Sequence, residues 1–267
     1  MPVELAVPRW WDWTLLVPSL AALIVLLARG LRSEAPAPPP ARWTAVHLAA
    51  AVLIHVLAQA AAMVAFDIPF LPASLAAGGA TMLVGAITCL AVLWITRASG
   101  SSWAALGLLP PRRLRNAAAV AAAYLAFIAP LGIVVWAWDR LLSSLGHVPI
   151  LQPALALYIE ARRHEEWAGM AVLVAGAVVV APVAEELLFR GLVFGVLRTL
   201  LGTPAAVFGA SALFAAFHFY PEVLVPIFLF GVVLNLVYVR TGSLAYAILL
   251  HLIFNGGTLL WTGLGGG

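Results

Sequence analysis

The sequence contains no lysine, a single cysteine and few charged residues, and each scarcity excludes a class of protein. Charged residues make up 9% of the 267 residues, far below the roughly 25% of soluble domains. Hydrophobic residues make up 64%, and the mean hydropathy is +1.06. Because Cys89 stands alone, neither an intramolecular disulfide nor a cysteine cluster for a metal can form. A chain of this composition needs a lipid bilayer as its solvent.

The basic residues do not predict a nucleic-acid-binding surface. All 14 of them are arginines, and most lie at the ends of apolar runs rather than in one patch. This distribution is typical of membrane topology signals and excludes nucleic acid as a partner. The arginine-only, alanine-rich usage is typical of a GC-rich bacterial genome, so the predicted location is a bacterial inner membrane.

Apolar runs of about 20 residues are long enough to cross a bilayer as helices. Eight such runs predict an all-α fold, a polytopic membrane helical bundle. They are expected at roughly Trp13–Ala28, Trp43–Phe66, Phe70–Ile95, Asn116–Trp138, Trp167–Leu200, Pro204–Phe219, Val223–Val239 and Leu244–Trp261. All the tryptophans except Trp103 fall at predicted span ends, where indole rings favour the membrane interface.

The arginines also predict how the spans are oriented. Nine arginines fall in alternate loops on one side of the membrane and four on the other, with Arg190 inside a span. The arginine-rich side is expected to be cytoplasmic, which places both termini outside the cytoplasm. In a rival interpretation, Leu15–Leu27 belongs to a cleaved signal peptide. Cleavage would leave the arginines from Arg97 to Arg115 outside, so eight spans are preferred.

Glu185, Glu186 and Arg190 interrupt an otherwise almost entirely apolar run from Ala168 to Leu201. Charged groups at membrane depth are costly, so they mark polar cavities or catalytic sites. In a helix, Glu186 and Arg190 lie one turn apart and can form an ion pair, while Glu185 points about 100° away. Pro182 removes a backbone hydrogen bond and can open the helix toward a cavity. The plainer alternative is a buried ion pair that only fixes helix packing.

Two later spans each contribute a histidine. His251 precedes Asn255 by one helical turn, so both lie on one face of the last span, and His218 lies in the sixth span. A lone membrane histidine is more often a helix-to-helix hydrogen-bonding group, as expected for His47 and His55. Together with the glutamates, however, these residues supply a base, a second proton-handling or metal-binding group, and oxyanion donors.

The motifs that carry these residues resemble those of the CPBP family, which includes the CAAX prenyl endopeptidases and bacterial Abi-type proteins. Four motifs match in family order: Ala181 to Gly191 (EExxxR), Phe214-x-x-x-His218, Phe230-Gly231 with Arg240 to Leu244, and His251-x-x-x-Asn255. The resemblance predicts a protease core at residues 166–262. Residues 1–165 form an N-terminal part without a recognisable motif.

The resemblance implies an intramembrane endopeptidase that acts on a membrane protein or peptide. The implied roles are a general base (Glu185) that activates water with His218, oxyanion donors (His251, Asn255), and an organising ion pair (Glu186, Arg190). The family has been described both as glutamate-type and as metalloproteases. Glu185, His218 and His251 can hold a divalent metal such as Zn2+, but no HExxH helix occurs. A mechanism without a cofactor is therefore preferred.

Two other functional classes compete with this interpretation. Gly209 to Ala212 looks like a rhomboid serine-protease motif without its last glycine, with Ser211 as the nucleophile and His251 as the histidine. A helix-packing face of small residues explains it better, because a serine mechanism leaves Glu185 and His218 without a role. The other class is a non-catalytic membrane scaffold, a bacteriocin immunity factor or a transporter. The absence of a sequence repeat argues against a transporter.

Overall fold

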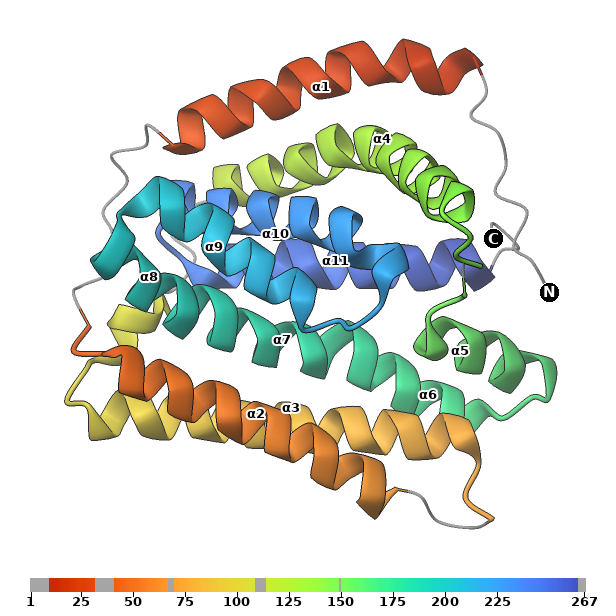
Figure 1. Cartoon of the computed structure of the whole chain (residues 1–267), viewed down its shortest axis with the longest axis horizontal. Coiled ribbons are helices and arrows are strands. Elements are labelled where there is room, and N and C mark those ends of the chain that lie inside the picture. The colour runs from red at the N-terminus through yellow and green to blue at the C-terminus, as the bar shows by residue number, and fades with distance from the viewer. Residues whose placement is uncertain (1–9, 32–40, 67–69, 109–113, 149, 264–267) are drawn as a thin grey trace.

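The computed structural model describes residues 10–31, 41–66, 70–108, 114–148 and 150–263. Within these residues the regular elements are helical and no strand occurs, which confirms the all-α prediction (Figure 1). The longer elements are α1 (Trp10–Leu31), α2 (Ala45–Ala65), α3 (Ala73–Ala98), α4 (Leu114–Ser144), α5 (Pro153–Arg163), α6 (Trp167–Ala175), α8 (Phe194–Leu201), α9 (Thr203–Ala216), α10 (Pro221–Thr241) and α11 (Leu244–Gly263). The shorter elements are η1 (Trp103–Leu106), η2 (Gly176–Val180), α7 (Ala181–Glu186) and η3 (Leu187–Val193).

Six of the described helices are long and apolar enough to cross a membrane, so the chain is a multi-pass membrane protein. They are α2, α3, most of α4, the continuous 35-residue helix from α6 to α8, α10 and α11. The first and sixth predicted spans correspond to shorter apolar helices, Leu16–Val25 and Thr203–Ala216. The predicted count of eight is therefore approximate, because α9, with 14 residues, is too short to cross a bilayer unaided, whereas α1 as a whole has 22 residues.

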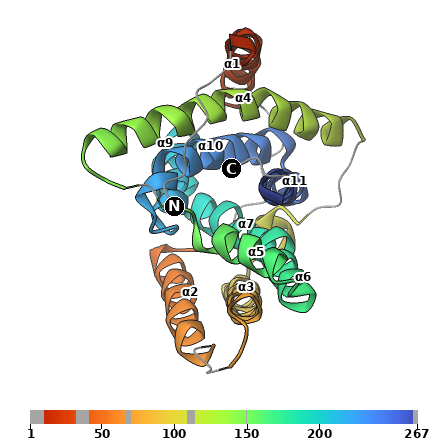
Figure 2. The same ribbon diagram turned by 90° about the vertical axis from the view of Figure 1, so that its right-hand side faces the viewer.

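α10 is the central helix of the bundle. Within the most apolar 18 residues of α10, 61% of the residues are buried. The corresponding share is 22–33% in the other five helices that can cross a membrane. α10 packs against α9, α4, α11 and α1. α1 lies along α4 on one side of the molecule, and α2 pairs with α3 on the other (Figures 1 and 2). Most residues of α10 are therefore shielded from lipid.

The N-terminal helices pack directly on the region that carries the motifs. α3 runs alongside α6, η2 and α7. A Cβ added at Gly78 would lie 2.6 Å from the backbone nitrogen of Leu173, so this close approach requires glycine. His55 on α2 lies with its Nδ1 2.8 Å from Thr88 Oγ1 on α3, which confirms the helix-to-helix role predicted for it. His47 differs, because its Nδ1 accepts a hydrogen bond from the backbone amide of Thr44, the N-cap residue of its own helix.

The tryptophans only partly follow the interfacial prediction. Trp94, Trp167 and Trp261 are exposed. Trp43, by contrast, is buried in the hydrophobic core, and a Cβ on Gly195 would lie 2.8 Å from its ring. The missing side chain at Gly195 makes room for this indole on α8, so Trp43 serves packing rather than the interface.

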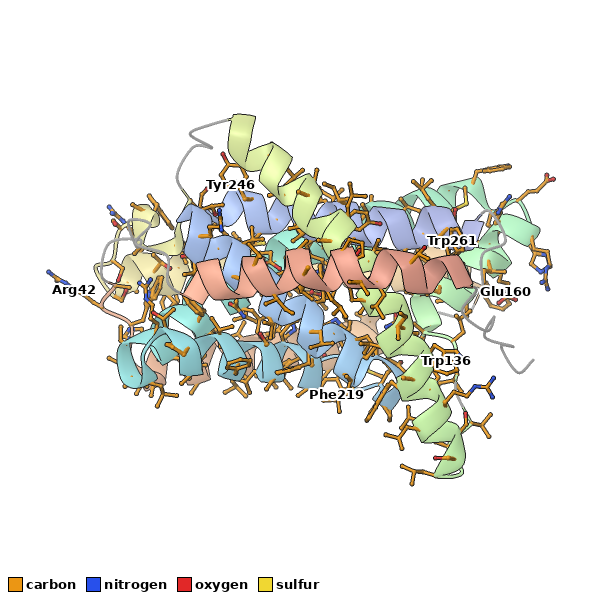
Figure 3. All side chains as sticks on the ribbon, turned by 90° about the horizontal axis from the view of Figure 1, so that it is seen from above. Arg42, Trp136, Glu160, Phe219, Tyr246 and Trp261 are labelled. Carbon is orange, nitrogen blue, oxygen red and sulfur yellow. The ribbon has the colours of Figure 1, made fainter. Side chains whose placement is uncertain are left out.

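The two ends of the bundle carry different loops. Figure 3 shows Arg42 at one end of the molecule and Glu160 and Trp261 at the opposite end. The predicted topology also assigns Arg42 and Glu160 to opposite sides of the membrane. Which of the two ends faces the cytoplasm stays a prediction from the arginine distribution.

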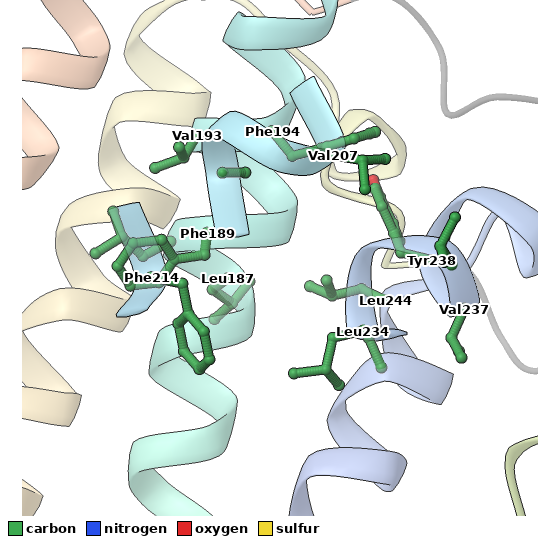
Figure 4. Close-up of a cluster of buried hydrophobic side chains, with 14 of the residues drawn as sticks. Leu187, Phe189, Val193, Phe194, Val207, Phe214, Leu234, Val237, Tyr238 and Leu244 are labelled. Atoms are coloured by element: carbon green, nitrogen blue, oxygen red, sulfur yellow. The ribbon is translucent and has the colours of Figure 1, made fainter. Parts of the chain in front are cut away.

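A hydrophobic cluster surrounds the middle of the bundle. Figure 4 shows Leu187 and Phe189 of the helix α6 to α8 near Phe214 of α9, with Leu234 of α10 and Leu244 of α11 close by. All five side chains are at most 5% exposed. Polar groups that lie among these helices are therefore held in an apolar, largely water-free shell.

Candidate active site

The two glutamates lie in a short α-helical stretch, α7, between two π-helical segments. η2 precedes this stretch and η3 follows it, within one continuous helix. π-helical turns are frequent at functional sites. The helix continues through Pro182, and just before it the backbone hydrogen bonds change from the α to the π pattern in η2.

Glu186 and Arg190 form the ion pair expected from their spacing. Arg190 Nη1 donates to Glu186 Oε1 at 3.0 Å, and both side chains are fully buried. Arg190 Nη2 donates to the backbone oxygen of Gly231 at 3.3 Å. The guanidinium carbon lies 4.3 Å from the centre of the Phe214 ring, close enough for a cation–π interaction. Arg190 thus joins the glutamate helix to α9 and α10.

His251 bridges the two glutamates from α11. Its Nδ1 lies 2.8 Å from Glu186 Oε1, and its Nε2 lies 3.8 Å from Glu185 Oε2. An ionised carboxylate only accepts hydrogen bonds, so the Nδ1–H of His251 is the donor to Glu186. The side chain of Glu186 is fully buried, whereas that of Glu185 is 24% exposed. Of the two carboxylates, Glu185 is therefore the one that water can reach.

His218 approaches this cluster from the end of α9. Its Nδ1 donates to the backbone oxygen of Phe214 at 2.8 Å, which leaves Nε2 as the nitrogen that can accept a proton. The Phe214 ring meets the His218 ring at 4.9 Å and the His251 ring at 5.8 Å between centroids, both edge to face. Among the described residues no hydrogen bond joins His218 to Glu185. The buried Phe214 ring is thus the surface that both histidines share.

Asn255 contacts the glutamate helix one turn beyond His251. Its Nδ2 donates to the backbone oxygen of Ala177 in η2 at 2.8 Å. The side-chain amide has a second hydrogen, which this bond does not use. The predicted site residues thus come from the helix α6 to α8, the turn that follows α9, and α11. Each of them is held by at least one polar contact to a neighbouring turn or helix.

Residues 167–257 match the family model described as type II CAAX prenyl endopeptidase Rce1-like. The matched segment contains all six predicted site residues. The resemblance to CPBP intramembrane proteases is confirmed. The match supports intramembrane endopeptidase activity in general and a membrane-associated substrate. Searches of curated proteins and of solved structures gave no match.

The Rce1-like segment contains buried polar residues that the sequence analysis did not single out, among them Glu222 and Asn235 of α10. Asn235 on α10 is fully buried, and its Nδ2 lies 3.0 Å from the backbone oxygen of Gly231, the carbonyl that also accepts from Arg190. Nδ2 also lies 3.0 Å from Ser211 Oγ. An amide within the apolar run of α10 was the signal that could have pointed to it.

Ser211 lacks the partner that a serine protease would need. Its hydroxyl donates to the backbone oxygen of Val207 at 2.6 Å and accepts from Asn235. His251, the histidine of the serine alternative, is bonded to Glu186 instead. Ser211 therefore joins α9 to α10, in agreement with the packing role preferred for this stretch.

The predicted metal ligands are not gathered into one site. Within the part of the chain that the structure describes, no group of three or more His, Cys, Asp or Glu side chains is arranged to hold a metal ion. His251 faces the two glutamates, whereas Nδ1 of His218 is turned to its own helix backbone. The Glu185, His218 and His251 side chains as placed do not fit a three-ligand zinc centre.

Proposed function

We propose that the chain hydrolyses a peptide bond in a membrane protein or membrane-associated peptide, with Glu185 as the general base. The contrast between the two adjacent glutamates carries this proposal. Glu186 is fully buried and bonded to Arg190 and His251, so it serves as a fixed charge partner. Glu185 is partly exposed, and its ionic contact to His251 is longer, 3.8 Å between Oε2 and Nε2. Such a carboxylate is free to bind and deprotonate water.

In the proposed reaction, Glu185 takes a proton from water while the water oxygen attacks the scissile carbonyl carbon. The electron pair of the carbonyl moves to its oxygen and forms an oxyanion. His218 offers Nε2 as a second acceptor for the attacking water. His251 Nε2 and the unused amide hydrogen of Asn255 donate to the oxyanion. As the carbon–nitrogen bond breaks, Glu185 returns the proton to the leaving amine, which restores the enzyme.

We propose a glutamate-type mechanism rather than a metalloprotease mechanism. The distribution of the candidate ligands supports this choice, because no three His, Cys, Asp or Glu side chains among the described residues are grouped to hold a metal ion. The location proposed for the protein is a bacterial inner membrane with both termini outside the cytoplasm. The unequal distribution of arginines between the two sets of loops supports this orientation.

The experiment that tests the proposal is Glu185→Gln. Glutamine keeps the volume of the side chain and one acceptor oxygen but is not a base, so cleavage should be abolished while the melting temperature stays near that of the wild type. The matched control is Glu160→Gln, which removes a carboxylate from the exposed end of α5. Comparative membrane proteomics of the two strains should show an uncleaved precursor only with Glu185→Gln.

The same comparison separates the enzyme from the scaffold or immunity factor. A non-catalytic protein would keep its cellular effect in the Glu185→Gln strain, because the substitution leaves the fold and the surface unchanged. Full retention of cleavage in that strain would end the assignment of Glu185 as the base.

A further inference from the structure

The π-helical pattern of η2, followed by a proline at position 182, removes the donor expected for one backbone carbonyl. The amide of Ala181 donates to the oxygen of Gly176, five residues earlier, as in a π-helix. In this pattern the next pair would be the amide of residue 182 and the oxygen of Ala177. Residue 182 is proline, which has no amide hydrogen. The Ala177 carbonyl therefore needs a partner from outside the helix, because an unsatisfied carbonyl at membrane depth is costly.

Asn255 is that partner. Its Nδ2 reaches across from α11 and donates to Ala177 O at 2.8 Å. This bond uses one of the two amide hydrogens and fixes both the position and the rotation of the amide plane. His251, one turn earlier on the same helix, is fixed independently by its 2.8 Å bond to Glu186. The face of α11 that carries both residues is thus attached at two points to the glutamate helix.

We infer that Pro182 is a positioning residue for Asn255. Because proline cannot donate a hydrogen bond, it keeps the Ala177 carbonyl available to Asn255 and so directs the second amide hydrogen toward the site. The catalytic part of this inference rests on the proposed function. The exchange of hydrogen-bond donors at Ala177 does not depend on any activity. A proline inside a helix normally lowers stability, and such local costs are typical of functional sites.

The first test is Pro182→Ala, which restores an amide hydrogen that can bond the Ala177 carbonyl. We expect the melting temperature to rise. The substrate for the kinetic assay is the precursor that accumulates in the Glu185→Gln strain. With this substrate, kcat should fall by on the order of 10-fold to 100-fold with little change in KM. Pro182→Val, closer to proline in volume, should behave in the same way and shows that a cavity is not the cause. If Pro182 had a purely structural role, its replacement would change the stability and the activity of the protein in the same direction.

The matched control is Pro130→Ala. Pro130 also lies inside a membrane helix and is buried, but it belongs to α4. The substitution likewise restores a helix amide, so stability should be kept or raised while kcat stays at the wild-type value. A fall in kcat equal to that of Pro182→Ala would overturn the inference, because the effect would then be common to any proline removed from the bundle.

A second test needs no substrate. Asn255→Ala should lower the melting temperature of the wild type by roughly 2–4 °C, the size expected for one lost buried hydrogen bond in a chain of this length. In the Pro182→Ala background, where residue 182 supplies a donor, the same substitution should lower it distinctly less. Equal shifts in both backgrounds would overturn the inference, whether or not any peptide is cleaved.

The two tests distinguish failure of the inference from failure of the proposed function. Suppose that Asn255→Ala lowers the melting temperature by different amounts in the two backgrounds and that Glu185→Gln still cleaves fully. The exchange of donors at the Ala177 carbonyl would then be supported, and the assignment of Glu185 as the general base would be rejected. If the shifts in melting temperature differ but Pro182→Ala leaves kcat unchanged, the positioning of Asn255 by Pro182 would be rejected. The proposed protease function would not be affected.

Discussion

Arg190→Ala should destabilise the protein strongly, because it removes one partner of a fully buried ion pair. Glu186 would lose its 3.0 Å bond to the guanidinium, the Gly231 carbonyl would lose a donor, and the Phe214 ring would lose the cation above it. Breaking a buried pair in this way typically costs about 3–5 kcal/mol. We expect the lower part of that range, since His251 still donates to Glu186. Even about 3 kcal/mol is a large fraction of the roughly 5–15 kcal/mol that stabilises a typical protein.

The assay is thermal melting of the purified protein in detergent, together with its abundance in the membrane. Arg163→Ala serves as the control, because Arg163 is exposed on α5 and its removal should change stability by no more than about 0.5 kcal/mol. The double variant Glu186→Gln with Arg190→Met removes both charges at similar volume, so it should recover most of the stability but not the activity. A single Arg190→Ala variant that melts with the wild type, or a double variant no more stable than the single one, would refute the reasoning.

Two further predictions concern topology and metal dependence. A tag at the C-terminus should be extracytoplasmic, and a tag in the loop at Arg112 should be cytoplasmic. Arg112 lies outside the described residues. Protease access to that loop on intact cells would contradict the predicted orientation. Purified protein should keep its activity in chelator, whereas Asn255→Ala should cost about 10²–10³ in rate. One tightly bound zinc per chain, lost in His218→Ala, would end the preference for a metal-free mechanism.

The sequence predicts contacts within one helix well. The Glu186–Arg190 pair follows from a spacing of four residues, since a helical period determines which side chains meet. The bond from His251 to Glu186 spans 65 residues and that from Asn255 to Ala177 spans 78, and no local period encodes them. The motifs could place these residues in one site, but the partner of each came only from the packing of α11 on η2 and α7.

The outcome at Pro182 shows the same limit. The sequence indicates that a backbone hydrogen bond is lost there, but the way in which the lost bond is replaced depends on a helix that begins more than sixty residues later. Trp43 was misplaced for a related reason, because its burial depends on the glycine at position 195 of another helix. Asn235 was passed over, since a single amide in an apolar run carries no motif.

The position of His251 between two carboxylates has a consequence for the balance of charge in the proposed reaction. To donate from Nε2 while Nδ1 donates to Glu186, the ring must carry both hydrogens and one positive charge. Glu185, Glu186, Arg190 and His251 then sum to zero. When Glu185 takes the proton of water, the four groups sum to +1, and the oxyanion that appears beside them carries −1. The total stays at zero throughout, so the reaction creates no net charge inside the membrane, where an uncompensated charge costs most.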